Sequence, residues 1–245
     1  MAKILATTYG ANLLIVARRE DRLRELQAEL QASAGVRVDL CVADLSKLED
    51  VDRVIEVASK GRELYGAILN AGVTHFGAYK DLDWNAFRSM LDTNVIATVR
   101  MATAFVPVLE QHGGGLMIVS SMAGIFAVPY QTHYSATKAF LVHFGVGLWH
   151  ELQGRNVSVT SYAPSGVVSE MTAGDNFTPL RRWLMPVDQA AREGVEAFRT
   201  RKYLHISGFA NRVGSAFARM LPHRFTTSLV AAQYRNALKK QSSAL

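Results

Sequence analysis

Tyr134, Lys138 and Ser121 have side chains that together could move a proton to or from the oxygen of a carbonyl or an alcohol. Tyr134 and Lys138 are four residues apart, so they lie on the same face if this segment is a helix. An ammonium group beside a phenol favours the phenolate and lowers its pKa from the usual value near ~10. Ser121 follows an apolar run, and its hydroxyl could donate to the same substrate oxygen. These residue types predict reversible reduction of a carbonyl.

Three further motifs occur along the chain in a recognisable order. They are Asp44-Leu45 after the apolar alternation of residues 36–42, Asn70-Ala71-Gly72 after the apolar run of residues 65–69, and Asn94 within a helical pattern. With Ser121 thirteen residues before Tyr134, this order resembles the short-chain dehydrogenase/reductase family from about residue 3 to about residue 200. The resemblance implies an α/β fold in a single domain, built on a Rossmann-like, doubly wound parallel sheet.

The resemblance also assigns roles to individual residues. It implies that the catalytic residues are Asn94, Ser121, Tyr134 and Lys138. It implies that the cofactor is bound by Arg18, Arg19, Asp44, Leu45, Asn70, Ala71, Gly72, Tyr134, Lys138, Val167 and Ser169. Ser121 would polarise the substrate oxygen while Tyr134 exchanges a proton with it. Lys138 would lower the Tyr134 pKa and hold the nicotinamide ribose, and Asn94 would support a water-linked proton relay.

The residues that follow the strand-like run 13–16 indicate which dinucleotide the chain prefers. An acidic side chain at this place would accept from the ribose 2′-hydroxyl of NAD(H). The chain has Ala17-Arg18-Arg19 instead, where the small residue leaves room for a 2′-phosphate and the guanidinium groups match its charge. The alternative is that both arginines lie in an ordinary solvated turn. We predict NADP(H) as the cofactor.

The glycine-rich turn of the family, Thr-Gly-x-x-x-Gly-x-Gly, does not precede residues 13–16. That turn follows the first strand and binds the cofactor pyrophosphate at a helix N-terminus. We therefore expect an N-terminally truncated fold without the first strand and the turn, with a gap in the sheet and weak binding of NADPH. The chain is either an enzyme whose start lies upstream, or a non-catalytic binding or scaffold relative that has lost its cofactor site. The retained catalytic positions favour the enzyme.

Short apolar runs alternate with helical patterns, which predicts a parallel sheet covered on both faces. We expect strands at residues 13–16, 36–42, 65–69, 116–120 and 157–162. We expect helices at residues 20–31, 48–60, 84–111 and 134–153, the third of them broken near Asn94. We assign residues 1–200 to the catalytic domain and residues 201–245 to a basic, amphipathic, helical extension of it.

Apolar residues after Ser121 and after Ser169 favour a largely apolar ketone or alcohol as the substrate. They are Phe126, Val128, Tyr130, Met171, Phe177, Leu180, Trp183, Leu184 and Met185. Ordinary packing of a C-terminal lobe would explain them equally well. Residues 139–149 are apolar nearly all round a helix, which favours a subunit interface and hence a homodimer or homotetramer. Deep burial of this helix is the alternative.

The charge of the chain is uneven. Nine Lys and Arg residues and no Asp or Glu follow Glu196, so this tail carries +9 in a chain of net charge +6. Peripheral association with an anionic membrane is one interpretation of such basic amphipathic helices. Coverage of a hydrophobic site, with the basic face in solvent, is the other. The tail has no aromatic-basic interleaving, so we predict no nucleic-acid partner.

Bulk properties agree with an enzyme of this kind. The hydrophobic content of 49% and a mean hydropathy of +0.07 indicate a globular protein, without a membrane-spanning run or a signal peptide. The single Cys41 excludes an internal disulfide and suits a reducing compartment. His143 and His150 have no partner residues at a zinc-like spacing, so we predict no metal site. We predict a cytoplasmic protein, with peripheral membrane association open.

Overall fold

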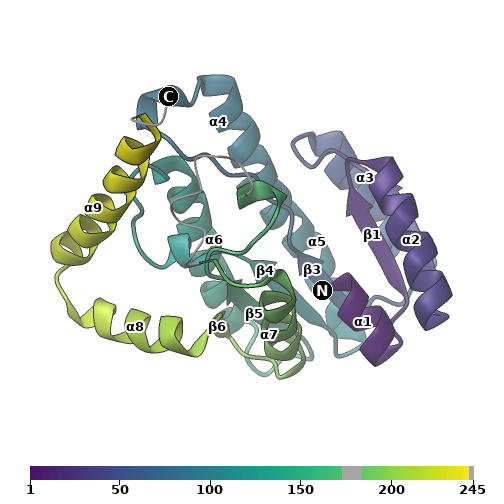
Figure 1. Ribbon diagram of the computed structural model, residues 1–245. Coiled ribbons are helices and arrows are strands. Elements are labelled where there is room, and N and C mark those ends of the chain that lie inside the picture. Colours follow the sequence, from purple (N-terminus) through teal and green to yellow (C-terminus); the bar gives the residue numbers. More distant parts are fainter. Residues whose placement is uncertain (173–183, 243–245) are drawn as a thin grey trace.

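The fold consists of parallel strands with helices on both sides, as Figure 1 shows. The computed structural model describes residues 1–172 and 184–242. It does not describe the side chains of Met171, His223, Gln233 and residues 236–242. One sheet contains β1 (Leu13–Ala17) and β2 (Val38–Val42). The other has the order β3 (Gly66–Leu69), β4 (Gly115–Val119), β5 (Ser158–Ala163) and β6 (Leu204–Ile206), and every pair is parallel. The predicted α/β fold is confirmed.

Strand β4 is apolar at every position after Gly115 because both of its faces are covered. Its side chains alternate between the two faces of the sheet. Leu116 and Ile118 pack in the core that includes α5 (Ala97–Gln111) and α6 (Thr132–Glu151). Met117 and Val119 pack on the opposite face, where Phe198 of α7 (Val187–Arg199) joins them.

The helix expected at residues 84–111 has the predicted break. It consists of α4 (Trp84–Leu91), the π-helical turn η2 (Asp92–Ile96) and α5. Asp83 caps α4, because its carboxylate accepts from the backbone N–H groups of Asn85 and Ala86. A π turn changes the direction in which side chains leave the helix, and such turns are frequent at functional sites. Here the turn contains Asn94.

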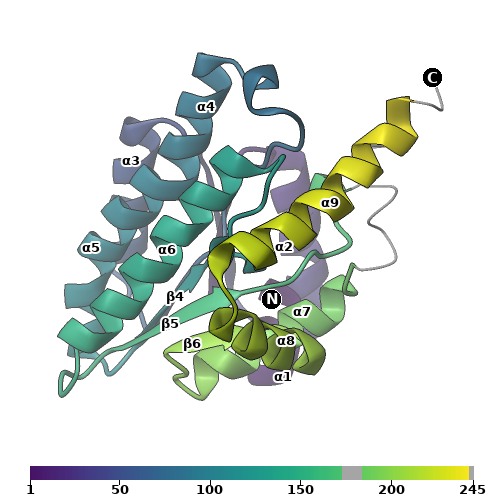
Figure 2. The same ribbon diagram turned by 90° about the vertical axis from the view of Figure 1, so that its left-hand side faces the viewer.

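The C-terminal region is partly helical and partly strand. Strand β6 lies within residues 201–245 and pairs with β5, which the sequence analysis did not anticipate because a run of three residues carries no readable pattern. It is followed by α8 (Phe209–Met220) and α9 (His223–Ser242). Figures 1 and 2 show these two helices along one side of the molecule, with α9 next to α6.

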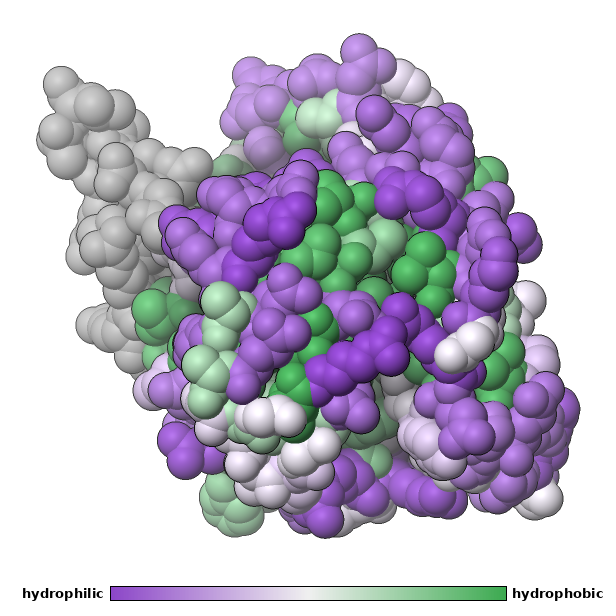
Figure 3. All heavy atoms as spheres, turned by 90° about the vertical axis from the view of Figure 1, so that its right-hand side faces the viewer, coloured by the Kyte–Doolittle hydropathy of each residue, from purple (hydrophilic) through white to green (hydrophobic). Residues whose placement is uncertain are grey.

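The sheet is divided between β1 and β3. Strand β1 packs with α2 (Glu20–Ala34) and α1 (Ala2–Tyr9) in a separate small core, and α3 (Leu48–Ser59) packs against α5. In the described part of the chain, no strand pairs with the second edge of β1 or with the second edge of β3. This is the gap that the sequence predicts. On the side of the molecule to the right of Figure 1, hydrophobic atoms lie in a hollow rimmed by hydrophilic residues (Figure 3).

Candidate active site

Ser121 and Tyr134 lie at the end of β4 and in the first turn of α6. Ser121 caps the short helix η3 (Met122–Gly124), because its hydroxyl oxygen accepts from the backbone N–H of Ala123 at 3.1 Å. The same side chain is hydrogen-bonded to the phenol of Tyr134. The loop and the helix therefore bring the two hydroxyl groups together, as the sequence predicts.

Close packing of η3 on α6 fixes this arrangement. The Ser120 hydroxyl donates to the carbonyl oxygen of Lys138 at 2.6 Å, and the Ser135 hydroxyl donates to the carbonyl oxygen of Ala123 at 2.7 Å. A Cβ on Gly124 would lie 2.4 Å from the Lys138 carbonyl oxygen, so only glycine allows this approach. Loop and helix consequently hold the Ser121 and Tyr134 side chains in register.

Lys138 lies in the interior, with 3% of its surface exposed. Its ammonium Nζ donates to the Val119 carbonyl oxygen at 3.0 Å and lies 5.8 Å from the centre of the Tyr134 ring. Burial lowers the pKa of Lys138 to about 8.

The pKa of Tyr134 changes in the direction opposite to the one expected from its sequence neighbour. Burial raises the Tyr134 pKa, and the hydrogen bond from Ser121 only partly opposes this. The reason is that protein atoms surround the phenol, so that desolvation of the phenolate is the largest effect on its pKa. Protein groups alone thus keep Tyr134 a proton donor at neutral pH.

Asn94 is fully buried beside these groups. Its side chain accepts from the Val73 N–H at 2.8 Å, donates to the Val73 carbonyl at 2.9 Å and donates to the Thr137 hydroxyl at 3.0 Å. A Cβ on Gly72 would lie 3.2 Å from both the Asn94 side-chain oxygen and the Lys138 ammonium. Asn94 therefore ties the segment after β3 to α6 and holds Gly72 against Lys138.

The predicted cofactor residues at the end of β1 line a hollow. Its volume is about 630 Å³, and its lining residues are Ala17, Arg18, Arg19 and Glu170. Arg19 forms an ion pair with Glu170 at 2.6 Å, and this hydrogen bond lowers the pKa of the Glu170 carboxyl. A guanidinium-lined hollow suits a phosphate group, which would compete with Glu170 for Arg19.

Asp44 lies after β2 and close to Arg18. Its carboxylate accepts from the Ser46 N–H at 3.1 Å and from the Ser46 hydroxyl at 2.9 Å. The backbone hydrogen bond from Ser46 lowers the Asp44 pKa, and Arg18 adds to this effect. Leu45 is buried, which leaves Asp44 as the member of the pair that can reach a ligand.

The other predicted cofactor residues lie at the ends of β3 and β5. Asn70 and Ala71 are exposed directly after β3. Val167 forms a parallel bridge with Met185, and its carbonyl oxygen accepts from the Thr172 hydroxyl at 2.7 Å. Ser169 is exposed, next to the Glu170 that binds Arg19. The residues predicted for the two ends of a dinucleotide site therefore lie after β1, β2, β3 and β5.

The centre of that site has no counterpart among residues 1–172 and 184–242. No glycine-rich turn lies between β1 and β3 in this part of the chain, so helix N–H groups for a pyrophosphate are not provided there. Within the same residues, no group of three His, Cys, Asp or Glu side chains could hold a metal ion. None of the helices described is long and apolar enough to cross a membrane.

Comparison with known proteins identifies the family. The model of the short chain dehydrogenase family matches residues 1–178. The chain belongs to the short-chain dehydrogenase family. A relative described as an uncharacterized oxidoreductase of Myxococcus xanthus is 35% identical over 170 residues, which are 69% of this chain and 67% of that protein. The hydroxysteroid 11-beta-dehydrogenase 1-like protein of Gallus gallus is 36% identical over 62% of this chain and 54% of its own length.

Solved structures of short-chain dehydrogenases share the fold. A short-chain dehydrogenase from Sphingobium yanoikuyae in complex with NADPH superposes with a TM-score of 0.80 and 26% identity, over 89% of this chain and 87% of that one. The Rossmann-like architecture is thus confirmed for this short-chain dehydrogenase.

Sequence reasoning missed two aromatic residues near the site of this short-chain dehydrogenase. Tyr234 of α9 contacts the ring of Phe76, with 5.5 Å between the ring centres. Burial raises the Tyr234 pKa, and the nearby Tyr134 raises it further. Helix α9 therefore packs close to Tyr134. Tyr234 lies in an amphipathic pattern, but nothing in that pattern shows which surface it covers.

Several residues expected to line an apolar pocket are buried or fall outside the described part of the chain. Phe177, Leu180 and Trp183 lie outside the described residues, as does the side chain of Met171. Met185 and Val128 are buried. Gln131 and Thr74, which form a side-chain hydrogen bond near Phe76, give this region some polar character.

Proposed function

We propose that the protein is an NADP(H)-dependent oxidoreductase that interconverts a carbonyl and a secondary alcohol on a largely apolar substrate. The observation that carries the proposal is the grouping of Ser121, Tyr134 and Lys138, with the first two hydrogen-bonded and the third 5.8 Å from the tyrosine ring. A proton donor, a hydroxyl that can polarise the substrate and a buried cation suit this reaction.

The protein residues handle the proton. When bound, NADPH supplies the hydride for the carbonyl carbon. Ser121 donates a hydrogen bond to the substrate oxygen, and Tyr134 gives its proton to that oxygen as negative charge develops there. The raised pKa of Tyr134 keeps it protonated before transfer, and the Lys138 cation stabilises the phenolate that remains. In the oxidation of an alcohol, the phenolate takes the proton back.

Asn94 acts as a positioning residue in this mechanism. It holds Val73 and Thr137 by hydrogen bonds of 2.8–3.0 Å and so keeps Gly72 and Lys138 in contact. Its substitution would loosen the cation beside Tyr134 without removing any reacting group.

Preference for NADP(H) is supported by the arginine-lined hollow after β1. Arg18 and Arg19 would bind the 2′-phosphate, and Asp44 would meet the adenine. Leu45 has a buried side chain, so it would take part only through its backbone. Asn70, Ala71, Gly72, Val167 and Ser169 would hold the nicotinamide end with Tyr134 and Lys138. The NADPH bound in the Sphingobium relative supports this choice.

We also propose a largely apolar substrate, because the Phe76 and Tyr234 rings pack on each other close to Tyr134. The name of the Gallus gallus relative, a hydroxysteroid dehydrogenase-like protein, supports a substrate with an apolar ring system. As partners we propose further copies of the chain in a homodimer or homotetramer. We place the enzyme in the cytoplasm, in peripheral association with a membrane.

Reductase assays test the proposed chemistry. Purified protein is given millimolar NADPH and a panel of apolar ketones, and the loss of NADPH absorbance is followed. Ser121→Ala should lower kcat by about 10²–10³-fold, as expected for the loss of one oxyanion donor. Tyr134→Phe should abolish turnover and keep the wild-type thermal unfolding, with Tyr203→Phe as the matched control. Near-normal turnover by Tyr134→Phe would contradict the mechanism.

One observation favours a second candidate function. Between β1 and β3, the described residues provide no strand and no glycine turn for a pyrophosphate. A non-catalytic binding or scaffold protein of the same family would tolerate this. Absence of both NADPH binding and turnover, in a protein that unfolds cooperatively, would favour this second function.

A further inference from the structure

The solvent-facing side of α8 is apolar. Phe209, Val213, Phe217 and Met220 follow one another at intervals of four, four and three residues, so they form one stripe along the helix. Phe209, Phe217 and Met220 are 76%, 66% and 83% exposed. A helix on the surface of a globular protein usually turns such a stripe toward the core. Helix α8 turns it toward solvent.

The side of α8 that faces the rest of the protein is polar. The Asn211 amide donates to the Ser207 carbonyl oxygen at 2.9 Å, and Arg212 pairs with Glu193 at 3.1 Å. Ser215 is buried on this side. A rotation that buried the apolar stripe would break these contacts, so the polar anchors hold the stripe outward.

Helix α9 extends the apolar surface. Phe225 and Leu229 are exposed and four residues apart, and Leu221 is exposed between the two helices. Both helices lie on the same side of the molecule (Figures 1 and 2). We call this surface the apolar face, and it consists of Phe209, Val213, Phe217, Met220, Leu221, Phe225 and Leu229.

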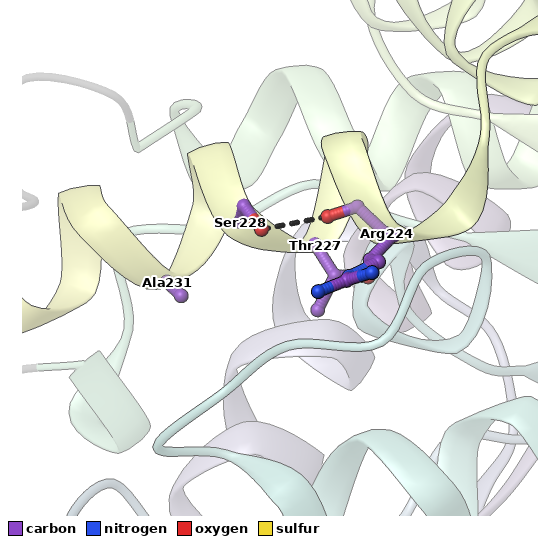
Figure 4. A pocket seen from close by; sticks show the side chains of 4 residues that line it. All are labelled: Arg224, Thr227, Ser228 and Ala231. Carbon is purple, nitrogen blue, oxygen red and sulfur yellow. Dashed lines mark hydrogen bonds between the residues drawn. The ribbon is translucent and has the colours of Figure 1, made fainter.

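Cationic side chains accompany the apolar face. Arg219 and Arg224 are exposed at its centre, where α8 ends and α9 begins. Arg224 also lines an open hollow of about 360 Å³ with Thr227, Ser228 and Ala231, which project from α9 in Figure 4. Guanidinium groups bind phosphate oxygens well. No carboxylate side chain follows Glu196 to oppose them.

We propose that the apolar face docks on the surface of an anionic membrane, with α8 and the first turns of α9 lying in the interface. Phe, Met and Leu side chains enter the boundary between headgroups and acyl chains, and Arg219 and Arg224 bind lipid phosphates. This identifies the surface for the peripheral association proposed above. It does not depend on the proposed catalysis, because no catalytic residue belongs to the apolar face.

A second copy of this chain fits the surface less well. A two-fold interface would place the same surface against itself, so Arg219 and Arg224 of the two copies would meet without carboxylates between them. Anionic lipid has the complementary charge and also takes up the apolar side chains. The charge of the tail therefore favours the membrane.

Vesicle flotation of the full chain tests the proposal. Vesicles of phosphatidylcholine with about 30% phosphatidylserine are compared with vesicles of phosphatidylcholine alone. The protein should bind the anionic vesicles and lose affinity as salt rises. The double variant Arg219→Gln/Arg224→Gln should bind about 30-fold more weakly, since two surface cations are removed. Phe217→Ser/Met220→Ser should weaken binding by about tenfold or more.

Trp84→Ser, which removes an exposed aromatic residue from α4, is the matched control and should bind like wild type. Circular dichroism and thermal unfolding establish that each variant is folded. The proposal is wrong if anionic vesicles are not bound, or if Phe217→Ser/Met220→Ser binds them like wild type. It is also wrong if sedimentation shows that this variant loses a dimer instead. Vesicle binding without reductase turnover contradicts only the proposed function.

Discussion

Burial controls the protonation of the two residues at the centre of the site. The ammonium group of Lys138 is surrounded by protein and donates to the Val119 carbonyl, and burial makes its charged form costly, so its pKa falls to about 8. Tyr134 is affected in the opposite sense, because burial disfavours its anion and raises its pKa. The pair therefore favours a neutral phenol that donates, rather than a phenolate that accepts, in the protein without substrate.

The lowered pKa of Lys138 makes the free energy of unfolding depend on pH. Its pKa is 10.5 in the unfolded chain and about 8 in the folded one, so between these values the unfolded state binds more protons and the stability of the fold rises with pH. We expect the stability of wild type relative to Lys138→Met to improve by about 2 kcal/mol between pH 7 and pH 9.5. Urea unfolding of both proteins at the two pH values measures this change in stability. A pH-independent difference would mean that Lys138 is solvated.

Arg18 and Arg19 should decide between the two dinucleotides. Arg18→Asp/Arg19→Ile should weaken NADPH binding strongly and NADH binding little, because only NADPH carries the 2′-phosphate that guanidinium groups bind. Calorimetric titration with each cofactor measures the two affinities.

Glu170→Gln is the companion variant for this prediction. It removes the carboxylate that occupies Arg19 at 2.6 Å, so it should strengthen NADPH binding. Equal losses for both cofactors in the arginine double variant would show that another part of the protein recognises the 2′-phosphate.

Helix α9 is the element of the C-terminal region that packs close to Tyr134. Its Tyr234 lies against Phe76 and close to Tyr134, although these residues are far apart in the sequence. The helix is attached to the chain through α8, whose polar side anchors it. One side of α9 thus lies close to Tyr134, while Phe225 and Leu229 on the same helix are exposed.

Tyr234→Ala should therefore change the substrate range. Removal of the ring opens space beside Phe76, so kcat/KM for bulky ketones should rise relative to that for small ketones. Parallel assays with a small and a bulky cyclic ketone measure this ratio. Tyr203→Ala, in which the lost ring packs on Trp149 instead, should leave the ratio unchanged. An unchanged ratio in Tyr234→Ala would exclude α9 from the substrate site.

On the scale of the whole molecule, the exposed side of α6 carries the large apolar residue Phe140 between Ala136 and His143. Phe140 is 46% exposed and stacks on Phe144 with 6.1 Å between the ring centres, and Ile96 is also exposed near the start of α5. The opposite side of α6 packs on β5 and η3. The helix thus serves the interior and the surface together, which accounts for its nearly uniform apolar sequence.

Phe140→Asp should weaken self-association if this face is the subunit interface. A charge at the centre of an apolar interface is costly to desolvate, so the variant should dissociate at concentrations where wild type is a dimer or tetramer. Analytical ultracentrifugation over a range of concentrations measures this. Tyr79→Asp, at an exposed position on η1 (Tyr79–Asp81), is the control. A wild-type protein that is monomeric throughout would contradict the expected oligomer.

Local patterns in the sequence were sufficient for the framework of the fold. Each of the five expected strands is present within two residues of its expected bounds, because a strand in such a sheet needs either a continuous apolar run, as in β4, or an alternation of apolar residues, as in β2. The break in the helix near Asn94 was also predicted from the sequence. The three-residue strand β6 was not, since its position depends on pairing with β5 rather than on a pattern of its own.

The pairing of Tyr134 with Lys138 follows from their spacing along one helix, and the order of the family's motifs added Ser121, so the sequence alone determined which residues meet at the site. Only the tertiary structure decided how they behave there. Whether an ammonium group lowers the pKa of a phenol depends on how far both groups are desolvated, and desolvation is set by segments distant in sequence. Packing between distant segments also decided three other features. They are the ion pair of Arg19 with Glu170, the position of Tyr234 near Tyr134, and the outward direction of the apolar stripe on α8. A spacing fixes neighbours along one element, whereas packing between elements fixes their environment.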